Sequence, residues 1–464
     1  MTSHRCAIVL TRLPDKKSQT ELRRNLTCFG LLALVVAIGV LAGAAQAGAA
    51  NGQGRSSLGS VASANSNIVI DWNRTLVDAL LVAHTAPQPG TRIGAIVQVS
   101  VFDAVNGIKG RYTQFHPEVI TTSAPRGASA PAAAAGAAYT ALVALFPAQK
   151  PTFDAQLAAT LAALPDGGTT PPVTRGLAWG ETVANAILAW RSADGFTATL
   201  PAYIVQPLPS WQPTPPAFAP PAWRQFAAMT PWALTSPGQF LPALPPAVTS
   251  ARYTQDFNEV KAIGNAATSP PDLVATARFW NAQGGFDTVA TIWNRTAEPL
   301  VSGGHASLVD NARFFALLNS SMADAVIAVW NAKNTYDTWR PITAIRNANV
   351  DSNDATLVDP GWTPVLVTPA FQEYPSGHSG VSTAAATVLA SFFGNDTTFT
   401  VSSDGAPGLP RTYSSFSDAI DEVALARIAG GIHFRFACDA AQQMGESVAD
   451  YALATKFLPR HGNH

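Results

Sequence analysis

Three short segments in the second half of the chain place basic side chains, imidazoles and glycines at close spacing. Their reactive or donor residues are Lys333, Arg340, Ser376, Gly377, His378, Arg427 and His433. Together they supply three cations, two imidazoles, a hydroxyl and the free backbone N–H groups of a helix N-terminus. Arginine forks and helix N-termini bind anion oxygens, while a neutral imidazole can attack or coordinate the central atom. The set predicts a site for a compact oxyanion such as phosphate or vanadate.

The local sequence predicts how each segment is held. The seven-residue spacing of Lys333 and Arg340 predicts one helical face, and Pro341 is expected to end that helix. Pro-Ser-Gly-His, beginning at Pro375, is expected to form a turn that opens an alanine-rich helix. The set does not suit zinc, because three cations would repel that metal and too few ligands are present.

Composition indicates a large helical protein with long ordered loops. The chain has 464 residues, of which 47% are hydrophobic and 13% charged, so it can bury a large core. Its 29 Lys and Arg balance 30 Asp and Glu, which argues against a nucleic-acid partner. The 34 glycines and 35 prolines interrupt the helical patterns and predict extended loops between helices.

The N-terminal segment is typical of an export signal. Residues 1–47 contain Arg23 and Arg24, an apolar run and a small-residue cleavage pattern ending at Ala47, and residues 48–66 read as a flexible spacer. The apolar run is too short for a usual membrane span, so we expect cleavage without a stable membrane anchor. The mature protein is therefore expected in the periplasm or outside the cell, and either the Sec or the twin-arginine route is compatible with the sequence.

Helical periodicity divides the mature chain into two bundles. Residues 67–200 are predicted as a first bundle, 201–250 as a proline-rich loop packed on the helices, and 251–464 as a second bundle that carries the oxyanion site. Helices are expected near 72–108 with a break at 87–90, and near 129–146, 150–163, 173–192, 251–264, 271–283, 306–334, 378–393, 416–431 and 439–456. No convincing strand pattern appears.

The two bundles are expected to be related by duplication. Trp-Asn-Arg-Thr at 72–75 recurs at 293–296, and the His, Arg and Asp-Ala-Val that follow it recur at the same shift of 221 residues. Weaker matches continue in the same order at larger shifts. A duplicated pair of four-helix bundles follows, so the fold class is predicted as all-α.

The three motifs together resemble the signature of a known family. Lys-x6-Arg-Pro, Pro-Ser-Gly-His and Arg-x5-His, in this order, are similar to the signature of the vanadium-dependent haloperoxidases and the related type-2 phosphatidic acid phosphatases. The segments 101–106, 213–220 and 312–346 look like bacterial haloperoxidases as well, so the likeness covers nearly the whole mature chain. The resemblance implies two four-helix bundles, in agreement with the duplication.

The resemblance also implies roles for the candidate residues. His433 would bind the vanadium of vanadate, and His378 would act as acid and base on the opposite side and on peroxide. Lys333, Arg340 and Arg427 would neutralise the equatorial oxygens. The hydroxyl of Ser376 and the N–H of Gly377 would donate hydrogen bonds.

Four positions indicate where the chain departs from the family pattern and which branch of the family it resembles. Ala426 stands where the family usually has serine, and Ala437 stands where phosphatases and some peroxidases carry an aspartate that supports the histidine, so His433 is expected to lack that support. Trp330 and Phe371 match aromatic positions of the chloroperoxidase branch and are candidate halide-site residues, with ordinary core packing as the alternative.

The sequence therefore favours an exported vanadate-dependent haloperoxidase. Hydrogen peroxide would oxidise chloride or bromide to a hypohalous species that halogenates an organic acceptor, and no oligomeric state follows from the sequence. An acid phosphatase that uses His433 as nucleophile remains an alternative, because vanadate mimics the five-coordinate state of phosphoryl transfer. A noncatalytic oxyanion-binding protein is a further alternative.

Overall fold

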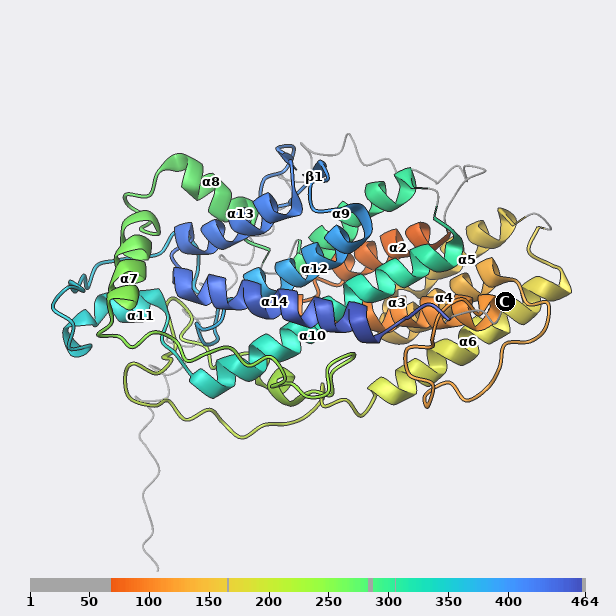
Figure 1. The fold of residues 1–464 in the computed structure, drawn as a ribbon, viewed down its shortest axis with the longest axis horizontal. Coiled ribbons are helices and arrows are strands. Elements are labelled where there is room, and N and C mark those ends of the chain that lie inside the picture. The colour runs from red at the N-terminus through yellow and green to blue at the C-terminus, as the bar shows by residue number, and fades with distance from the viewer. Residues whose placement is uncertain (1–67, 165–166, 283–286, 305, 461–464) are drawn as a thin grey trace, which may run out of the picture. The chain divides into compact units, whose positions relative to one another are not determined.

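Helices dominate the computed structural model, which describes residues 68–164, 167–282, 287–304 and 306–460 (Figure 1). The predicted signal peptide and spacer lie outside the described residues. A short antiparallel hairpin, β1 (Phe399–Val401) with β2 (Arg411–Tyr413), was not expected from the sequence. The prediction of an all-α bundle fold is confirmed.

The first bundle consists of helices with small residues at their contacts. Its elements are α2 (Ile68–Val82), α3 (Pro87–Lys109), α4 (Ala130–Leu145), η1 (Pro147–Gln149), α5 (Lys150–Ala162) and α6 (Pro171–Arg191). The hydroxyl of Ser129 caps α4 by accepting from the N–H of Ala132. A Cβ at Gly180 of α6 would lie 2.2 Å from the carbonyl oxygen of Ala133 in α4, so glycine permits the close contact of these helices.

The proline-rich segment that follows is docked on the helices. It contains η2 (Arg224–Ala228), and Trp211 and Trp232 are fully buried within it. The carboxylate of Asp324 accepts the backbone N–H groups of Trp232, Ala233 and Leu234. These contacts fix an extended loop against α10 without regular secondary structure.

The second half of the chain supplies the remaining helices. They are α7 (Ala251–Ile263), α8 (Pro271–Phe279), α9 (Val289–Gly303), α10 (Leu308–Tyr336), α11 (Pro341–Arg346), η3 (Ala348–Val350), α12 (Gly377–Phe393), α13 (Phe416–Ala429) and α14 (Arg435–Thr455). Helix α9 was not predicted from the sequence, because Pro299 interrupts its helical pattern. A reciprocal capping box of Thr288 and Thr291 starts α9, and the helix continues through Pro299.

The end of α10 corrects one expectation about the site. The helix stops at Tyr336 because Asp337 adopts a left-handed conformation with φ 48°. Lys333 and Arg340 therefore do not share one helical face, and Pro341 begins α11 instead of ending a helix. Although α10 is long and apolar enough to cross a membrane, 94% of its apolar window is buried, as in the core helix of a globular bundle.

Equivalent residues of the two repeats make equivalent contacts. Gln98 of α3 donates to Asn73 of α2 at 2.9 Å, and Asn319 of α10 exchanges hydrogen bonds with Asn294 of α9 at the same distance. These pairs are related by the 221-residue shift found in the sequence. The helices α3 and α10 also pack against each other, so the duplicated halves share one core.

Candidate oxyanion site

A loop before α12 holds two of the predicted cations by its carbonyl groups. Nζ of Lys333 donates to the carbonyl oxygens of Gln372 and Glu373 at 2.7 and 3.0 Å. Nε of Arg340 donates to the carbonyl oxygen of Phe371 at 2.7 Å. Residues 371–373 thus bring together side chains that come from α10 and from the linker before α11.

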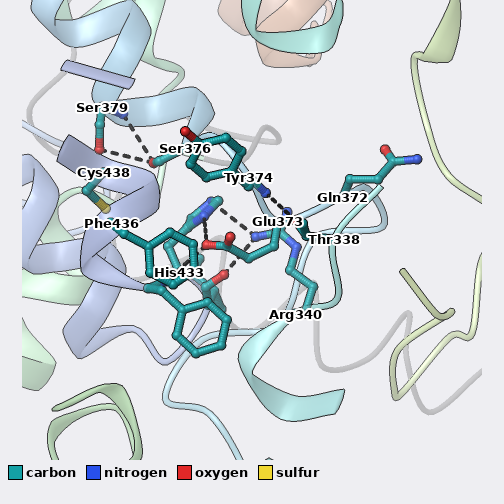
Figure 2. A network of polar contacts seen from close by, with 12 residues as sticks. Thr338, Arg340, Gln372, Glu373, Tyr374, Ser376, Ser379, His433, Phe436 and Cys438 are labelled. Carbon is teal, nitrogen blue, oxygen red and sulfur yellow. Dashed lines mark hydrogen bonds and ion pairs between the residues drawn. The ribbon is translucent and has the colours of Figure 1, made fainter. Parts of the chain in front are cut away.

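The same loop positions the second imidazole through a carboxylate (Figure 2). Oε1 of Glu373 lies 2.9 Å from Nδ1 of His433 and accepts the N–H of Phe434 at 3.0 Å. Nε2 of His433 lies 3.1 Å from Nη1 of Arg340. Since a guanidinium can only donate, Nε2 accepts this hydrogen bond through its lone pair and Nδ1 carries the proton.

Glu373 corrects the expectation that His433 lacks carboxylate support. Ala437 does not provide it, but a residue sixty positions earlier does. In the sequence, Glu373 is recognisable only as an acidic residue two positions before the Pro-Ser-Gly-His motif that begins at Pro375. That position predicted nothing about His433, because the contact depends on how two distant turns meet.

The site concentrates positive charge in a buried region. Lys333, Arg340 and Arg427 are each fully buried. Burial lowers the pKa of Arg340 to about 9 and that of Arg427 to about 10, and it also lowers the pKa of Lys333. Burial raises the pKa of Glu373 to about 7, although Arg340 and Lys333 oppose that shift. Three basic side chains outnumber the carboxyl group of Glu373 in this cluster, so the site favours an anion.

Two donor atoms of the arginines are unused in the described part of the chain. Nη1 of Arg427 donates to the carbonyl oxygen of Trp280 at 2.8 Å, but its Nε is buried without a partner. Nη2 of Arg340 is likewise buried and unpartnered among the described residues. A buried charged donor without an acceptor is costly, so both nitrogens are candidate donors to an oxyanion.

The start of α12 presents His378 to the same region. Its Nε2 lies 3.0 Å from the carbonyl oxygen of Asn281, an atom that can only accept, so Nε2 carries the proton and Nδ1 is unprotonated. Burial, with a contribution from Arg427, lowers the pKa of His378 well below its usual value. His378 is therefore a neutral imidazole whose unprotonated nitrogen is Nδ1.

The hydroxyl of Ser376 serves the helix in this structure. Ser376 is the N-cap of α12, and its Oγ accepts from the backbone N–H and the hydroxyl of Ser379. Gly377 is the first residue of the helix, where backbone N–H groups have no intrahelical acceptor. A Cβ at Gly377 would lie 3.4 Å from the ring of Trp330, so this backbone closely approaches the aromatic wall.

A cavity of about 230 Å³ opens on these groups. Its lining includes Gly377, His378, Arg427 and His433 of the predicted set, together with both candidate halide residues, Trp330 and Phe371. The rings of Trp330 and Phe371 lie 5.1 Å apart. Lys333 and Arg340 contact the ring of Phe371 and are absent from the lining found for the described residues, as is Ser376.

The turn between α13 and α14 places His433. Gly431 has φ +73°, and a Cβ there would lie 2.4 Å from the carbonyl oxygen of Gly264. A side chain is excluded on both conformational and steric grounds. The turn therefore approaches the segment after α7 closely enough to fix His433 two residues later.

The first repeat does not reproduce the cluster. The 221-residue shift places Tyr112 opposite Lys333 and Val119 opposite Arg340. The hydroxyl of Tyr112 donates to Asp310 at 2.6 Å, which is a structural contact between the repeats. The first repeat therefore shares the helical scaffold, whereas the cationic cluster lies in the second repeat.

The structure is that of a helical-bundle protein with a buried cluster of cationic side chains beside a cavity, and known proteins of similar fold were found. Residues 313–459 match the family model described as the VCPO second helical-bundle domain. The solved structure of a bacterial vanadium-dependent iodoperoxidase is similar with a TM-score of 0.72 and 26% identity, over 85% of this chain and 97% of that chain.

Two further structures share the fold at lower identity. The holo form of a bacterial vanadium-dependent chloroperoxidase has a TM-score of 0.59 and 19% identity, over 79% of this chain and 91% of that one. The apo form of a bacterial vanadium-dependent chloroperoxidase has a TM-score of 0.62 and 18% identity, over 79% and 93%. A search of curated proteins gave no match. The domain match and the iodoperoxidase likeness together support assignment of the chain to the vanadium haloperoxidase family.

Proposed function

We propose that the protein is a vanadate-dependent haloperoxidase, which uses hydrogen peroxide to oxidise halide to a hypohalous species. The observation that carries this proposal is the pair of buried, unpartnered guanidinium nitrogens of Arg340 and Arg427 in the same cluster as His433, whose Nε2 lies 3.1 Å from Nη1 of Arg340. The similar structures are described as vanadium-dependent iodo- and chloroperoxidases, which supports vanadate as the anion. Neither the phosphatase nor the noncatalytic alternative is favoured by these likenesses.

The residues present fit vanadate well. His433 would hold it through Nε2, whose lone pair would then no longer accept from Nη1 of Arg340, while Glu373 keeps the proton on Nδ1 and fixes the ring. Arg340, Arg427 and Lys333 would offset the charge of its oxygens, and the N-terminus of α12 would add backbone donors. Bound vanadate would supply the chemistry that activates peroxide toward halide.

His378 is suited to move the peroxide proton. Its Nε2–H is held by the carbonyl group of Asn281, so Nδ1 is the nitrogen that can accept a proton. Because the imidazole is neutral at ordinary pH, it can take that proton without first losing one. The surrounding burial limits the entry of bulk water to the cationic groups.

Chloride and bromide are the proposed halides, and Trp330 and Phe371 are proposed to line their site. Both rings contact the cation of Lys333, at 5.8 and 5.2 Å from their centroids. Next to a cation, the positively polarised edges of aromatic rings can face a weakly hydrated anion. The position of Trp330 and Phe371 beside Lys333 supports a halide site close to the proposed vanadate site.

The test compares vanadate-free and vanadate-loaded protein with bromide, peroxide and an organic acceptor. We expect halogenation after vanadate is added, and His433→Ala should lose both vanadate binding and turnover. His116→Ala, which removes an imidazole bonded to Glu118, serves as the matched control. A phosphatase would instead hydrolyse a phosphomonoester without vanadate and be inhibited by it. That result, without halide oxidation, would refute the proposal.

A further inference from the structure

The cavity above the cationic groups extends well beyond them. Its far wall comes from the turn between α2 and α3, in the first bundle, and another part comes from the proline-rich segment. The lining residues outside the oxyanion cluster that matter most are Gln88, Trp223, Val289, Val326, Trp330 and Phe371. Three separate parts of the chain therefore line one cavity together with the oxyanion cluster.

Gln88 is a polar group inside this space. It is 6% exposed and lines the cavity, and within the described residues its side-chain amide has no hydrogen-bond partner. Its backbone is fixed at the start of α3, where its carbonyl oxygen accepts from Thr91 at 2.9 Å. The amide therefore faces the cavity with both its donor and its acceptor free, so the position suits a ligand that can donate and accept.

The remaining walls are apolar and aromatic. Trp223 is held in place because the N–H of Ala222 donates to Ala370 at 2.8 Å and the indole of Trp330 donates to Ala222 at 3.4 Å. The volume of about 230 Å³ exceeds the roughly 150 Å³ that holds benzene in an apolar cavity. Because this volume includes the part next to His378, Arg427 and His433, it provides room for one substituted aromatic ring in the vanadate-free protein.

We propose that this cavity binds a phenol-like organic acceptor, with its hydroxyl hydrogen-bonded to Gln88 and its ring between the aromatic walls. The inference rests on the haloperoxidase activity proposed above and names the acceptor class for the same site. Halogen transfer then occurs inside the cavity, next to His378 and Arg427, and not by a hypohalous acid that has left the protein.

The chemistry balances without a further catalytic group. Peroxide, halide and one proton give hypohalous acid and water. The electron-rich ring then attacks the halogen, a carbon–halogen bond forms and the oxygen–halogen bond breaks. The hydroxide that leaves takes the ring proton and becomes water. A bound orientation would favour one ring carbon over the others.

Ligand binding tests the cavity without any turnover. Calorimetric titration of vanadate-free protein should give saturable binding of phenol and weaker binding of toluene. Gln88→Leu and Gln88→Met should each weaken phenol binding about tenfold and leave toluene unchanged, since one buried hydrogen bond is lost. Gln443→Leu, in the separate groove beside α14, is the matched control. Equal binding of phenol and toluene by the wild type would overturn the role of Gln88.

Product analysis separates this inference from the proposed function. The vanadate-loaded enzyme should brominate phenol with an ortho-to-para ratio different from that of free hypobromite, and Trp223→Ala should return the ratio toward that of the free reagent. Bromide-dependent peroxide consumption that yields the free-reagent ratio would overturn the acceptor site while the haloperoxidase proposal stands. An absence of bromide oxidation by the vanadate-loaded protein would instead defeat the proposed function.

Discussion

Oε1 of Glu373 lies 2.9 Å from Nδ1 of His433, so a buried carboxylate fixes the imidazole that faces the cationic groups. Both residues are buried, with 0% and 2% of their surface exposed. The same carboxylate oxygen accepts the N–H of Phe434, which ties the loop before α12 to the turn before α14. A contact between two segments far apart in the sequence thus sets the protonation state and direction of a single ring nitrogen.

Loss of this carboxylate should weaken vanadate binding. Glu373→Ala is expected to reduce vanadate affinity about 10- to 100-fold, because the ring loses the group that orients it. Glu373→Gln should lose less, since its amide oxygen can still accept from Nδ1. Titration followed by the absorbance of vanadate measures both, and Glu446→Gln on the exposed face of α14 is the control. Wild-type affinity in the alanine variant would exclude a positioning role.

His378 should affect turnover and not vanadate binding. In His378→Ala the groups around His433 remain, so vanadate affinity should change by less than about threefold, while peroxide turnover should fall about 100- to 10,000-fold. Steady-state rates and equilibrium titration on the same preparation distinguish the two effects. Parallel loss of affinity and rate would show that His378 contributes to holding the anion.

Phe371 should influence the choice of halide. Phe371→His replaces an apolar ring beside Lys333 by a polar imidazole, which changes the environment of the halide. We expect the chloride-to-bromide rate ratio to fall in favour of bromide. Competition assays at fixed peroxide give this ratio directly, and an unchanged value would remove Phe371 from the halide site.

Gly431 should be required for both stability and the site. Gly431→Ala combines an unfavourable φ of +73° with a Cβ placed 2.4 Å from a backbone oxygen. Gly408→Ala is a matched control, because Gly408 has φ +75° and open space around it. The control should cost about 1 kcal/mol of unfolding free energy, and Gly431→Ala should cost more and also weaken vanadate binding. Equal effects in denaturant melts would show that the close contact is unimportant.

Asp103 should make stability depend on pH. Burial raises its pKa from an ordinary value of 3.8 to about 7, so the folded state holds a proton that the unfolded state has already lost between those values. The free energy of unfolding should therefore fall as pH rises from about 4 to about 7, by up to about 1.4 kcal/mol per pH unit from this group. Asp103→Asn should remove that contribution, which denaturant melts at pH 5 and pH 8 can measure.

Asp324, which the 221-residue shift places opposite Asp103, provides the comparison for Asp103→Asn. Oδ2 of Asp103 has no partner among the described residues, so an amide can replace it, whereas both oxygens of Asp324 accept backbone N–H groups. Asp324→Asn would place an amide donor against N–H donors and should cost about 2 to 4 kcal/mol at either pH. Similar losses at both positions would contradict the assignment of these hydrogen bonds.

Local sequence determined the fold class and the chemical content of the site. Helical periodicity and alanine-rich contacts specify the bundles, and the repeated Trp-Asn-Arg-Thr blocks show the duplication. The spacing around Ser376 predicted the start of α12, because a cap depends on residues within one turn. The types of the charged residues alone were enough to indicate an oxyanion.

Tertiary structure decided which atoms meet. Glu373 lies 60 positions from His433, the carbonyl group that sets the tautomer of His378 belongs to Asn281, and Gln88 reaches the cavity from the first bundle. None of these contacts follows from periodicity, because each depends on the packing of elements distant in the sequence. The sequence therefore specified the groups that carry charge, while long-range packing of loops and helices determined their protonation and the shape of the space above them.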